Sequence, residues 1–125
     1  MEITNSKVAA DNRTDQVFDD IFWGFDVCRR TGSSRIKVLY DFYHVQIMNG
    51  DVVRTMRENL DLCCHVQVAG VPSRAELDRS EIDYRFIARE IADMGYTGFV
   101  SQEYTPAPGR NPLISMAIGY DILTV

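Results

Sequence analysis

Three apolar, strand-like segments of this chain each carry, near their carboxyl ends, a polar residue of a type that binds metal ions. They read KVLYDFYH, HVQVAG and GFVSQEYTP, at residues 37–44, 65–70 and 98–106. A fourth candidate strand covers residues 2–5. Polar residues at the carboxyl ends of successive parallel strands converge in space, and (β/α) barrels carry their chemistry there. We therefore expect one polar site built from Glu2, Asp41, Gln67 and Glu103.

Amphipathic stretches separate these strands. Apolar residues recur at three- and four-residue steps, which is the spacing of a helix, within residues 16–30, 52–60, 84–94 and 113–123. The predicted apolar stripes include Val17, Phe22 and Phe86. Thr14 or Asp15 is expected to cap the first helix, and His44 is expected in the loop after the second strand. The alternation of strands and helices predicts an α/β fold with a parallel sheet and right-handed crossovers.

The length limits how much of a barrel this chain can form. It has 125 residues, whereas a complete (β/α)₈ barrel takes about 250. We therefore expect a single domain over residues 1–125, of the (β/α) barrel type, in which about four βα units form a half-barrel. Because the first strand begins almost at Met1, the chain is expected to be the C-terminal half of a barrel, cut within its fifth strand. The alternative is a compact four-stranded α/β domain.

An open half-barrel would expose strand edges and an apolar face, so it predicts a partner, either a second copy or another chain. The net charge of −5 disfavours binding to nucleic acid, which requires clustered Lys and Arg. No apolar run reaches the ~20 residues of a membrane span. Cys28, Cys63 and Cys64 form no C-x-x-C pair, which favours reduced cysteines in a cytoplasmic protein.

Four motifs resemble hydroxypyruvate isomerases, which belong to the xylose isomerase-like barrel superfamily. The motifs are YDFYHVQIMNGD, HVQVAGVPSR, SEIDY and MGYTGFVSQEYTP, at residues 40–51, 65–74, 80–84 and 94–106. Sugar epimerases and endonuclease IV are more distant relatives. The resemblance runs from Glu2 to about Pro106 and covers only the C-terminal half of such enzymes. It implies an isomerase that moves a carbonyl between adjacent carbons of a small hydroxy-keto acid, such as hydroxypyruvate, or of a sugar.

The resemblance also assigns roles to individual residues. Glu2 and Glu103 match the two catalytic glutamates of the family, and His44 and Arg74 match residues that contact the substrate. The matching metal ligands are Glu2, Asp41, Gln67 and Glu103. Sugar epimerases carry histidine where this chain has Gln67, so the glutamine favours the hydroxypyruvate branch.

The chemistry of an enediol shift accounts for these residue types. A carboxylate within hydrogen-bonding reach can move the proton between the two carbons, and a divalent cation stabilises the enediolate charge. Three carboxylates and one amide oxygen form an all-oxygen site, which suits Mg²⁺ or Mn²⁺. We therefore expect one of these two ions as the cofactor.

Other interpretations remain open at this point. Asp41 can instead cap a helix or close a loop, Gln67 can form an interior amide hydrogen bond, and Glu103 can be a solvated carboxylate. The chain also departs from the family pattern: RAEL at 74–77 replaces RHEP, and SEIDY at 80–84 replaces GEINY. The rival functions are a non-catalytic remnant or assembly module, a sugar epimerase, and a phosphodiesterase of the endonuclease IV type.

Overall fold

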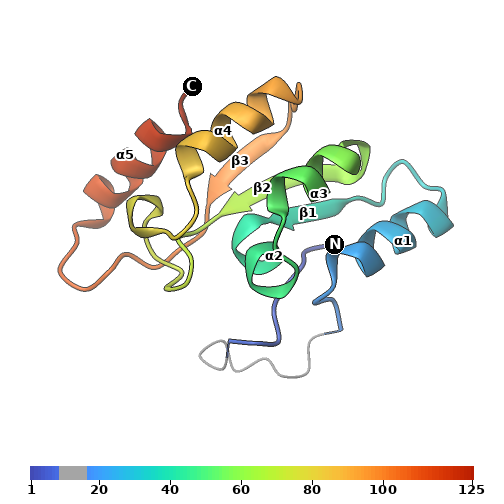
Figure 1. The fold of residues 1–125 in the computed structure, drawn as a ribbon, viewed down its shortest axis with the longest axis horizontal. Coiled ribbons are helices and arrows are strands. Elements are labelled where there is room, and N and C mark those ends of the chain that lie inside the picture. Colours follow the sequence, from blue (N-terminus) through green and yellow to red (C-terminus); the bar gives the residue numbers. More distant parts are fainter. Residues whose placement is uncertain (9–16) are drawn as a thin grey trace.

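The computed structural model describes residues 1–8 and 17–125 and has the predicted alternation of helices and strands (Figure 1). The helices are α1 (Ile21–Thr31), α2 (Phe42–Met48), α3 (Val52–Glu58), α4 (Tyr84–Asp93) and α5 (Pro112–Leu123). The strands β1 (Val38–Asp41), β2 (Cys63–Val68) and β3 (Phe99–Gln102) form a parallel sheet in the order β1-β2-β3. Short 3₁₀ turns lie at Leu60–Leu62 and Leu77–Arg79. No helix in these two described ranges is long and apolar enough to cross a bilayer.

The first predicted strand, residues 2–5, is reduced to a single bridge. Glu2 pairs with Leu39 in parallel, which places the N-terminal segment beside β1. Within the sheet, Asp41 pairs with Gln67, and Gln67 pairs with Ser101. Because successive side chains of a strand alternate between faces, this register puts the predicted site residues on one face, near the carboxyl ends of the strands.

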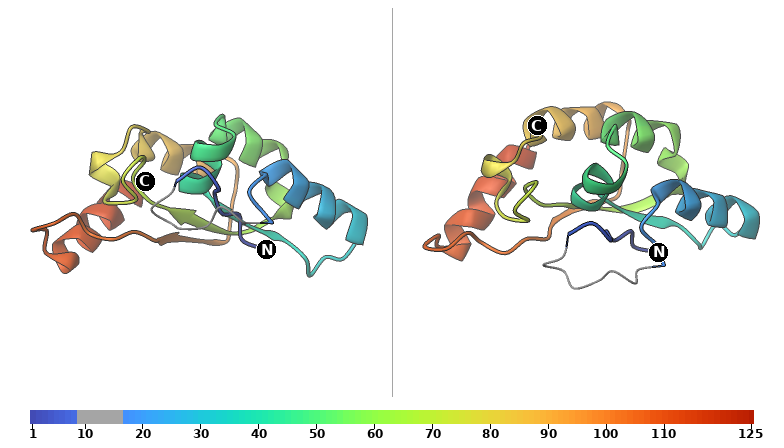
Figure 2. Two further views of the ribbon diagram at one scale, coloured as in Figure 1. Left: turned by 90° about the horizontal axis from the view of Figure 1, so that it is seen from below. Right: turned by 60° about the horizontal axis from the view of Figure 1, so that its bottom comes forward.

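The two faces of the sheet differ in what covers them. Val38, Tyr40, Val66 and Val68 are fully buried, and Figure 2 shows α1, α3 and α4 on one side of the sheet. On the other face, which carries Asp41 and Gln67, Phe99 is 78% exposed. The structure is therefore a partial (β/α) barrel whose inner face is open.

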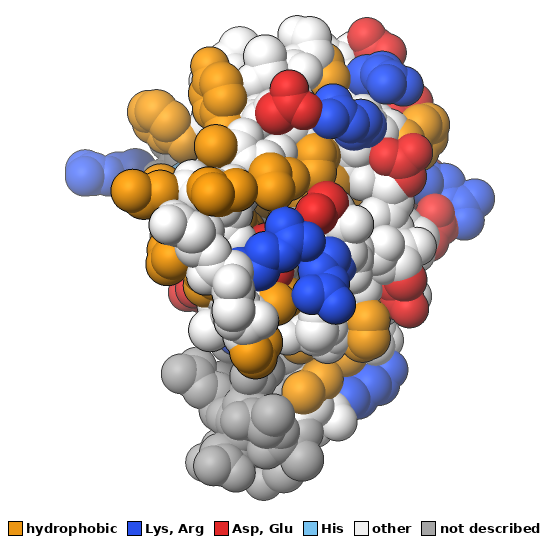
Figure 3. Space-filling model, turned by 90° about the vertical axis from the view of Figure 1, so that its left-hand side faces the viewer, with side chains coloured by type: hydrophobic (Ala, Val, Ile, Leu, Met, Phe, Trp, Pro, Cys, Tyr) orange, Lys and Arg blue, Asp and Glu red, His pale blue; other side chains and the backbone are white. Residues whose placement is uncertain are grey.

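Helix α5 carries a second open apolar surface. Its exposed apolar side chains are Leu113, Ile114, Met116 and Tyr120. Figure 3 shows hydrophobic side chains gathered at this end of the molecule. A helix that is apolar on all sides is normally buried in a larger structure, and here α5 packs mainly against α4 and the turn at Leu77–Arg79.

The predicted start of the first helix at residue 16 is wrong. Helix α1 begins at Ile21, because the Asp20 side chain accepts a hydrogen bond from the Phe22 backbone N–H and caps the helix there. Val17 precedes the helix and is 83% exposed. Phe22 and Phe86 were expected on apolar stripes, yet both are exposed. The predicted caps Thr14 and Asp15 lie outside the described residues.

The predicted loop around His44 is also wrong, since β1 leads directly into α2. Asp41 ends the strand, and its Oδ1 accepts a hydrogen bond from the Tyr43 backbone N–H at 2.8 Å. This cap starts the helix at Phe42, and His44 is buried within it. The structural interpretation of Asp41 as a cap is therefore confirmed, and it leaves the second carboxylate oxygen for another role.

Two phenylalanines on α1 provide a matched test of the core. Phe25 is 1% exposed and its ring stacks on that of Tyr40 at 6.5 Å, whereas Phe22 is 54% exposed. Phe25→Ala is expected to lower the free energy of unfolding by about 3–5 kcal/mol, through lost burial and a residual cavity. Phe22→Ala is expected to change it by less than about 1 kcal/mol. Urea denaturation of both variants measures this, and equal losses would contradict the burial of Phe25 and the exposure of Phe22.

Candidate active site

Asp41 is the most deeply buried carboxylate at the carboxyl ends of the strands. It is 1% exposed, and its Oδ2 atom has no hydrogen-bond partner among the described residues. Burial raises the pKa of Asp41 to about 7, although the backbone N–H of Tyr43 and the charge of Arg74 both favour the ionised form. A buried carboxylate oxygen that accepts no hydrogen bond is costly, which makes it a candidate for binding a cation or a substrate.

Gln67 presents the same feature on the neighbouring strand. It lies opposite Asp41 in the register of β1 and β2. Its Oε1 atom is also buried and has no hydrogen-bond partner among the described residues. The predicted interior amide hydrogen bond through this oxygen is therefore not present in that part of the chain. Two unsatisfied oxygens on adjacent strands form a donor set of the type that Mg²⁺ and Mn²⁺ prefer.

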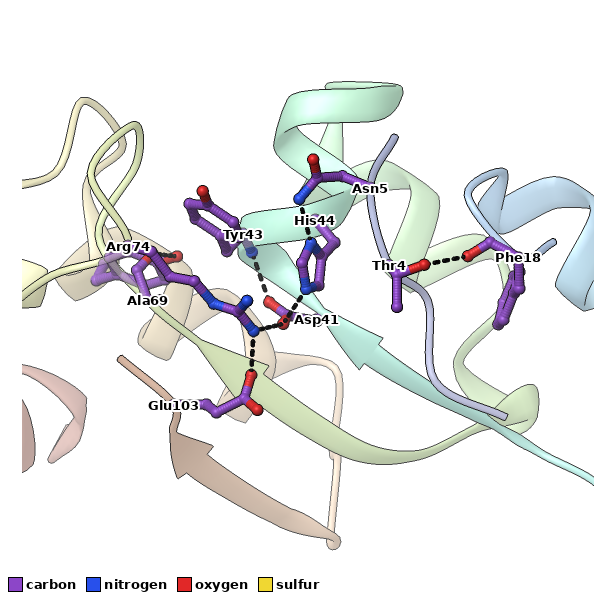
Figure 4. Close-up of polar contacts among 10 residues, drawn as sticks. Thr4, Asn5, Phe18, Asp41, Tyr43, His44, Ala69, Arg74 and Glu103 are labelled. Carbon is purple, nitrogen blue, oxygen red and sulfur yellow. Dashed lines mark hydrogen bonds and ion pairs between the residues drawn. The ribbon is translucent and has the colours of Figure 1, made fainter. Parts of the chain in front are cut away.

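Arg74 and Glu103 lie beside Asp41 and form an ion pair (Figure 4). Arg74 Nη2 donates to Glu103 Oε2 at 2.6 Å and lies 4.0 Å from Asp41 Oδ2. The guanidinium also lies 5.2 Å from the centre of the Tyr43 ring, a favourable cation–π distance. Glu103 follows β3 directly, and its side chain is 41% exposed. The pair therefore joins the ends of β1 and β3 at the solvent-facing edge of the site.

The loop that carries Arg74 is tightly built. Gly70 N–H donates to Ala75 O at 2.8 Å, and a Cβ at Gly70 would lie 2.3 Å from the carbonyl oxygen of Glu76, so only glycine fits. Arg74 itself has φ 51°, in the left-handed region that is uncommon outside glycine. Such strained conformations concentrate at functional sites, which supports the choice of Arg74 as a site residue.

His44 contacts Asp41 from α2. Its Nε2 atom lies 3.4 Å from Asp41 Oδ2, and its Nδ1 atom lies 2.8 Å from Nδ2 of Asn5. Asn5 is buried, and sequence reasoning did not select it. Its position three residues after Glu2, in the segment expected to enter the site, was the signal that could have identified it.

Glu76 is a second residue that sequence reasoning did not select. It is fully buried and accepts hydrogen bonds from the Ala107 backbone N–H and the Ser115 hydroxyl. These bonds tie the Arg74 loop to the segment after Glu103 and to the first turns of α5. Glu76 therefore supports the site rather than entering it.

The structure does not join Glu2 to the other predicted ligands. Glu2 is exposed and pairs with Leu39, two residues before Asp41 along β1. Within residues 1–8 and 17–125, no group of three or more His, Cys, Asp or Glu side chains is close enough to hold a metal ion. The unsatisfied oxygens of Asp41 and Gln67 fit a hard cation, and the complete four-residue ligand set stays a prediction.

The parallel sheet with its flanking helices agrees with comparisons to known proteins. A sequence model described as "xylose isomerase-like TIM barrel" matches residues 9–118. The chain belongs to this family. The predicted fold class is thereby confirmed, and a match to a hydroxypyruvate isomerase confirms the resemblance to those enzymes.

Individual members of the family show how much of a barrel the chain represents. It is 36% identical over 88 residues to a 2-oxo-tetronate isomerase of Cupriavidus necator, covering 70% of this chain and 34% of that protein. It is 37% identical over 75 residues to hydroxypyruvate isomerase of Escherichia coli, covering 60% and 29%. The chain thus spans about a third of the length of the curated relatives it matches.

A solved structure of the family supports the partial barrel. The crystal structure described as an AP endonuclease, family 2, from Brucella melitensis superposes with a TM-score of 0.78 at 30% sequence identity. The superposition covers 84% of this chain and 39% of that chain. The three strands and their helices therefore correspond to a segment of a complete xylose isomerase-like barrel.

Proposed function

We propose that the chain provides the metal-binding half of an isomerase that acts on a small hydroxy-keto acid, such as hydroxypyruvate or 2-oxo-tetronate. One observation carries the proposal: two buried, unsatisfied oxygens, of Asp41 and Gln67, lie beside the Arg74–Glu103 pair at the carboxyl ends of the strands. The names of the relatives from Cupriavidus necator and Escherichia coli support the type of reaction. The substrate class follows from those names and from the chemistry of the site together.

The proposed roles of Glu103, Arg74 and His44 follow from their positions in the site, and that of Glu2 rests on the family resemblance alone. Glu103, with Glu2, moves the proton between the two carbons, because a partly exposed carboxylate can reach substrate and exchange protons. Arg74 binds the substrate carboxylate through its planar guanidinium, which offers two parallel donors. His44 contacts a substrate oxygen.

A divalent cation fits the proposed site. Asp41 and Gln67 would hold Mg²⁺ or Mn²⁺, together with Glu2 and Glu103 as the remaining predicted ligands. When bound, the ion supplies charge stabilisation for an enediolate. The buried Asp41 carboxylate would gain most from such an ion, because its pKa is raised by burial to about 7 in the structure without it.

We further propose that a second polypeptide completes the barrel, either as another copy of this chain or as a partner chain. The open inner face carries Phe99, which is 78% exposed, and α5 carries Leu113, which is 76% exposed. Strand β3 has a hydrogen-bonded neighbour only on its β2 side among the described residues. Unpaired strand edges and apolar patches of this kind favour association.

An isomerase assay tests the proposed function directly. The purified chain is incubated with hydroxypyruvate or a 2-oxo-tetronate, with Mn²⁺ or Mg²⁺ or with a chelator, while light scattering reports its mass. We expect turnover that requires the metal and that belongs to an assembled species rather than to a monomer. A folded, assembled sample without turnover on either substrate would instead support a non-catalytic module.

The same preparation distinguishes the remaining rivals. A metal-dependent epimerase would convert ketohexoses and leave the keto acids unchanged. An endonuclease of the Brucella protein's described type would cleave DNA at abasic sites. The net charge of −5 disfavours the second of these, because DNA binding depends on Lys and Arg at the phosphates.

A further inference from the structure

Two buried side chains connect the N-terminal segment to the carboxyl end of β1, and the proposed roles use only one of them. Asn5 is 1% exposed and His44 is 3% exposed. Asn5 Nδ2 lies 2.8 Å from His44 Nδ1, and Figure 4 shows this contact on the side of the imidazole away from Asp41. A buried contact of this kind sets where the imidazole carries its proton.

The orientation of the Asn5 amide follows from its second partner. The Val8 backbone N–H donates to Asn5 Oδ1 at 2.9 Å. A backbone N–H only donates, so the amide atom that faces Val8 is the oxygen. The amide NH₂, which also only donates, consequently faces His44.

Nδ1 of His44 therefore accepts a hydrogen bond, and an accepting ring nitrogen carries no proton. A neutral imidazole then carries its proton on Nε2. That atom lies 3.4 Å from Asp41 Oδ2, which has no hydrogen-bond partner among the described residues. We propose that Asn5 is a positioning residue, which holds neutral His44 in the Nε2–H tautomer with this N–H directed at the site carboxylate.

The opposite tautomer would be unfavourable on both sides of the ring. Nδ1–H would face the donating NH₂ of Asn5, and a bare Nε2 would face a carboxylate oxygen. Two donors would then meet at Nδ1, and two acceptors would meet at Nε2. Neither pair can form a hydrogen bond, and in a buried environment this costs free energy. The Arg74 guanidinium, 4.0 Å from the same Asp41 oxygen, favours the ionised carboxylate on that side of the ring, and Asn5 is the partner of Nδ1 on the other side.

The consequence for catalysis rests on the proposed function. In the Nε2–H form, His44 offers a donor to Asp41 or to a substrate oxygen, but Nε2 has no lone pair for a metal ion or for a proton. His44 therefore binds and orients the substrate, and proton transfer belongs to the carboxylates. Asn5 also ties the segment that begins at Glu2 to the site.

The tautomer is measurable without any activity, by long-range ¹H–¹⁵N correlation spectra of the ¹⁵N-labelled full chain. Protonated and bare ring nitrogens have well separated ¹⁵N shifts, so the two neutral tautomers give distinct patterns. The chain has two histidines, and a His65→Gln variant assigns their signals. Spectra are recorded at about pH 9, well above the ordinary imidazole pKa of about 6.5.

We expect wild-type His44 to show the Nε2–H pattern alone. Asn5→Asp replaces the donating NH₂ with an accepting oxygen and is expected to reverse the pattern to Nδ1–H. In the isomerase assay, the same variant is expected to lose about 10- to 100-fold in turnover, the usual effect of a group that orients a site residue. Asn5→Ala serves if the aspartate variant does not fold, and it is expected to populate both tautomers.

A wild-type spectrum with Nδ1–H, or with an even mixture, would overturn the proposal. An unchanged Nε2–H pattern in a folded Asn5 variant would do so too, because Asp41 rather than Asn5 would then set the proton. An inactive chain with the expected spectra would count against the proposed isomerase and leave the role of Asn5 intact.

Discussion

Glu103→Gln is expected to lower metal-dependent isomerase turnover by about 10²–10⁴-fold, the usual contribution of a general acid–base group. Glutamine keeps the size of the side chain and an oxygen that can accept the hydrogen bond of Arg74, which lies 2.6 Å from Glu103 Oε2. It removes the ability to take and return a proton, together with the negative charge that pairs with Arg74 and would contact the metal ion. With the metal ion at saturating concentration, the fall is therefore expected mainly in kcat.

The matched control is Glu58→Gln. Glu58 ends α3 and is exposed, and it borders a hollow with Cys63 and Tyr96 rather than the candidate site. This variant has the same chemical change and is expected to retain full turnover. Equal activity of wild type and Glu103→Gln would remove Glu103 from the proton transfer. Loss of activity in both variants would point to assembly or folding instead.

The order of helices and strands was predictable because it depends on short-range patterns. Apolar periodicity located β1, β2, β3 and the helices α1, α3, α4 and α5, and the motif at residues 40–51 placed Asp41 at a strand end. In the structure Arg74 lies close to both Asp41 and Glu103, whereas Glu2 does not join them and the complete four-residue site stays a prediction. Parallel strands bring their carboxyl ends together whatever sequence lies between them. The closeness of residues at these ends could therefore be predicted without knowing how individual side chains pack.

The errors arose where one side chain overrides a periodic pattern. Asp20 caps α1, so the apolar spacing that continues back to Val17 is not helical. Asp41 caps α2, which turns an expected loop into a helix. The roles of Asn5 and Glu76 depend on partners 39 residues away in each case, and no local pattern reports such pairings.

Asp41→Asn is expected to stabilise the metal-free protein at alkaline pH and to abolish its response to metal. Burial raises the pKa of Asp41 from 3.8 to about 7. Between these values the folded state retains a proton that the unfolded chain has released, so the free energy of unfolding falls as the pH rises. This change in the pKa of Asp41 lowers the free energy of unfolding by roughly 4 kcal/mol, because each tenfold change in proton affinity corresponds to about 1.4 kcal/mol.

Asparagine removes this dependence and keeps the local structure, since its amide oxygen can still accept from the Tyr43 N–H and cap α2. With a chelator present, the stabilising effect should be near zero below about pH 4 and complete above about pH 7. The control is Asp26→Asn, whose side chain is 58% exposed and pairs with Arg30. Its effect should stay under about 1 kcal/mol at every pH.

The effect of a metal ion on stability tests whether the buried charge of Asp41 serves to bind a cation. In urea denaturation at about pH 8, Mn²⁺ at 100 times its dissociation constant should stabilise wild type by about 2.7 kcal/mol. Asp41→Asn should show no such gain, because the variant lacks the buried anionic ligand at the centre of the proposed site. If Asp41→Asn is more stable than wild type in chelator and is not stabilised by Mn²⁺, the buried carboxylate destabilises the metal-free fold and serves to bind a cation. An Asp41→Asn variant that is less stable than wild type in chelator would mean that His44 and Arg74 already satisfy this carboxylate, and the proposed metal site would lose its main support.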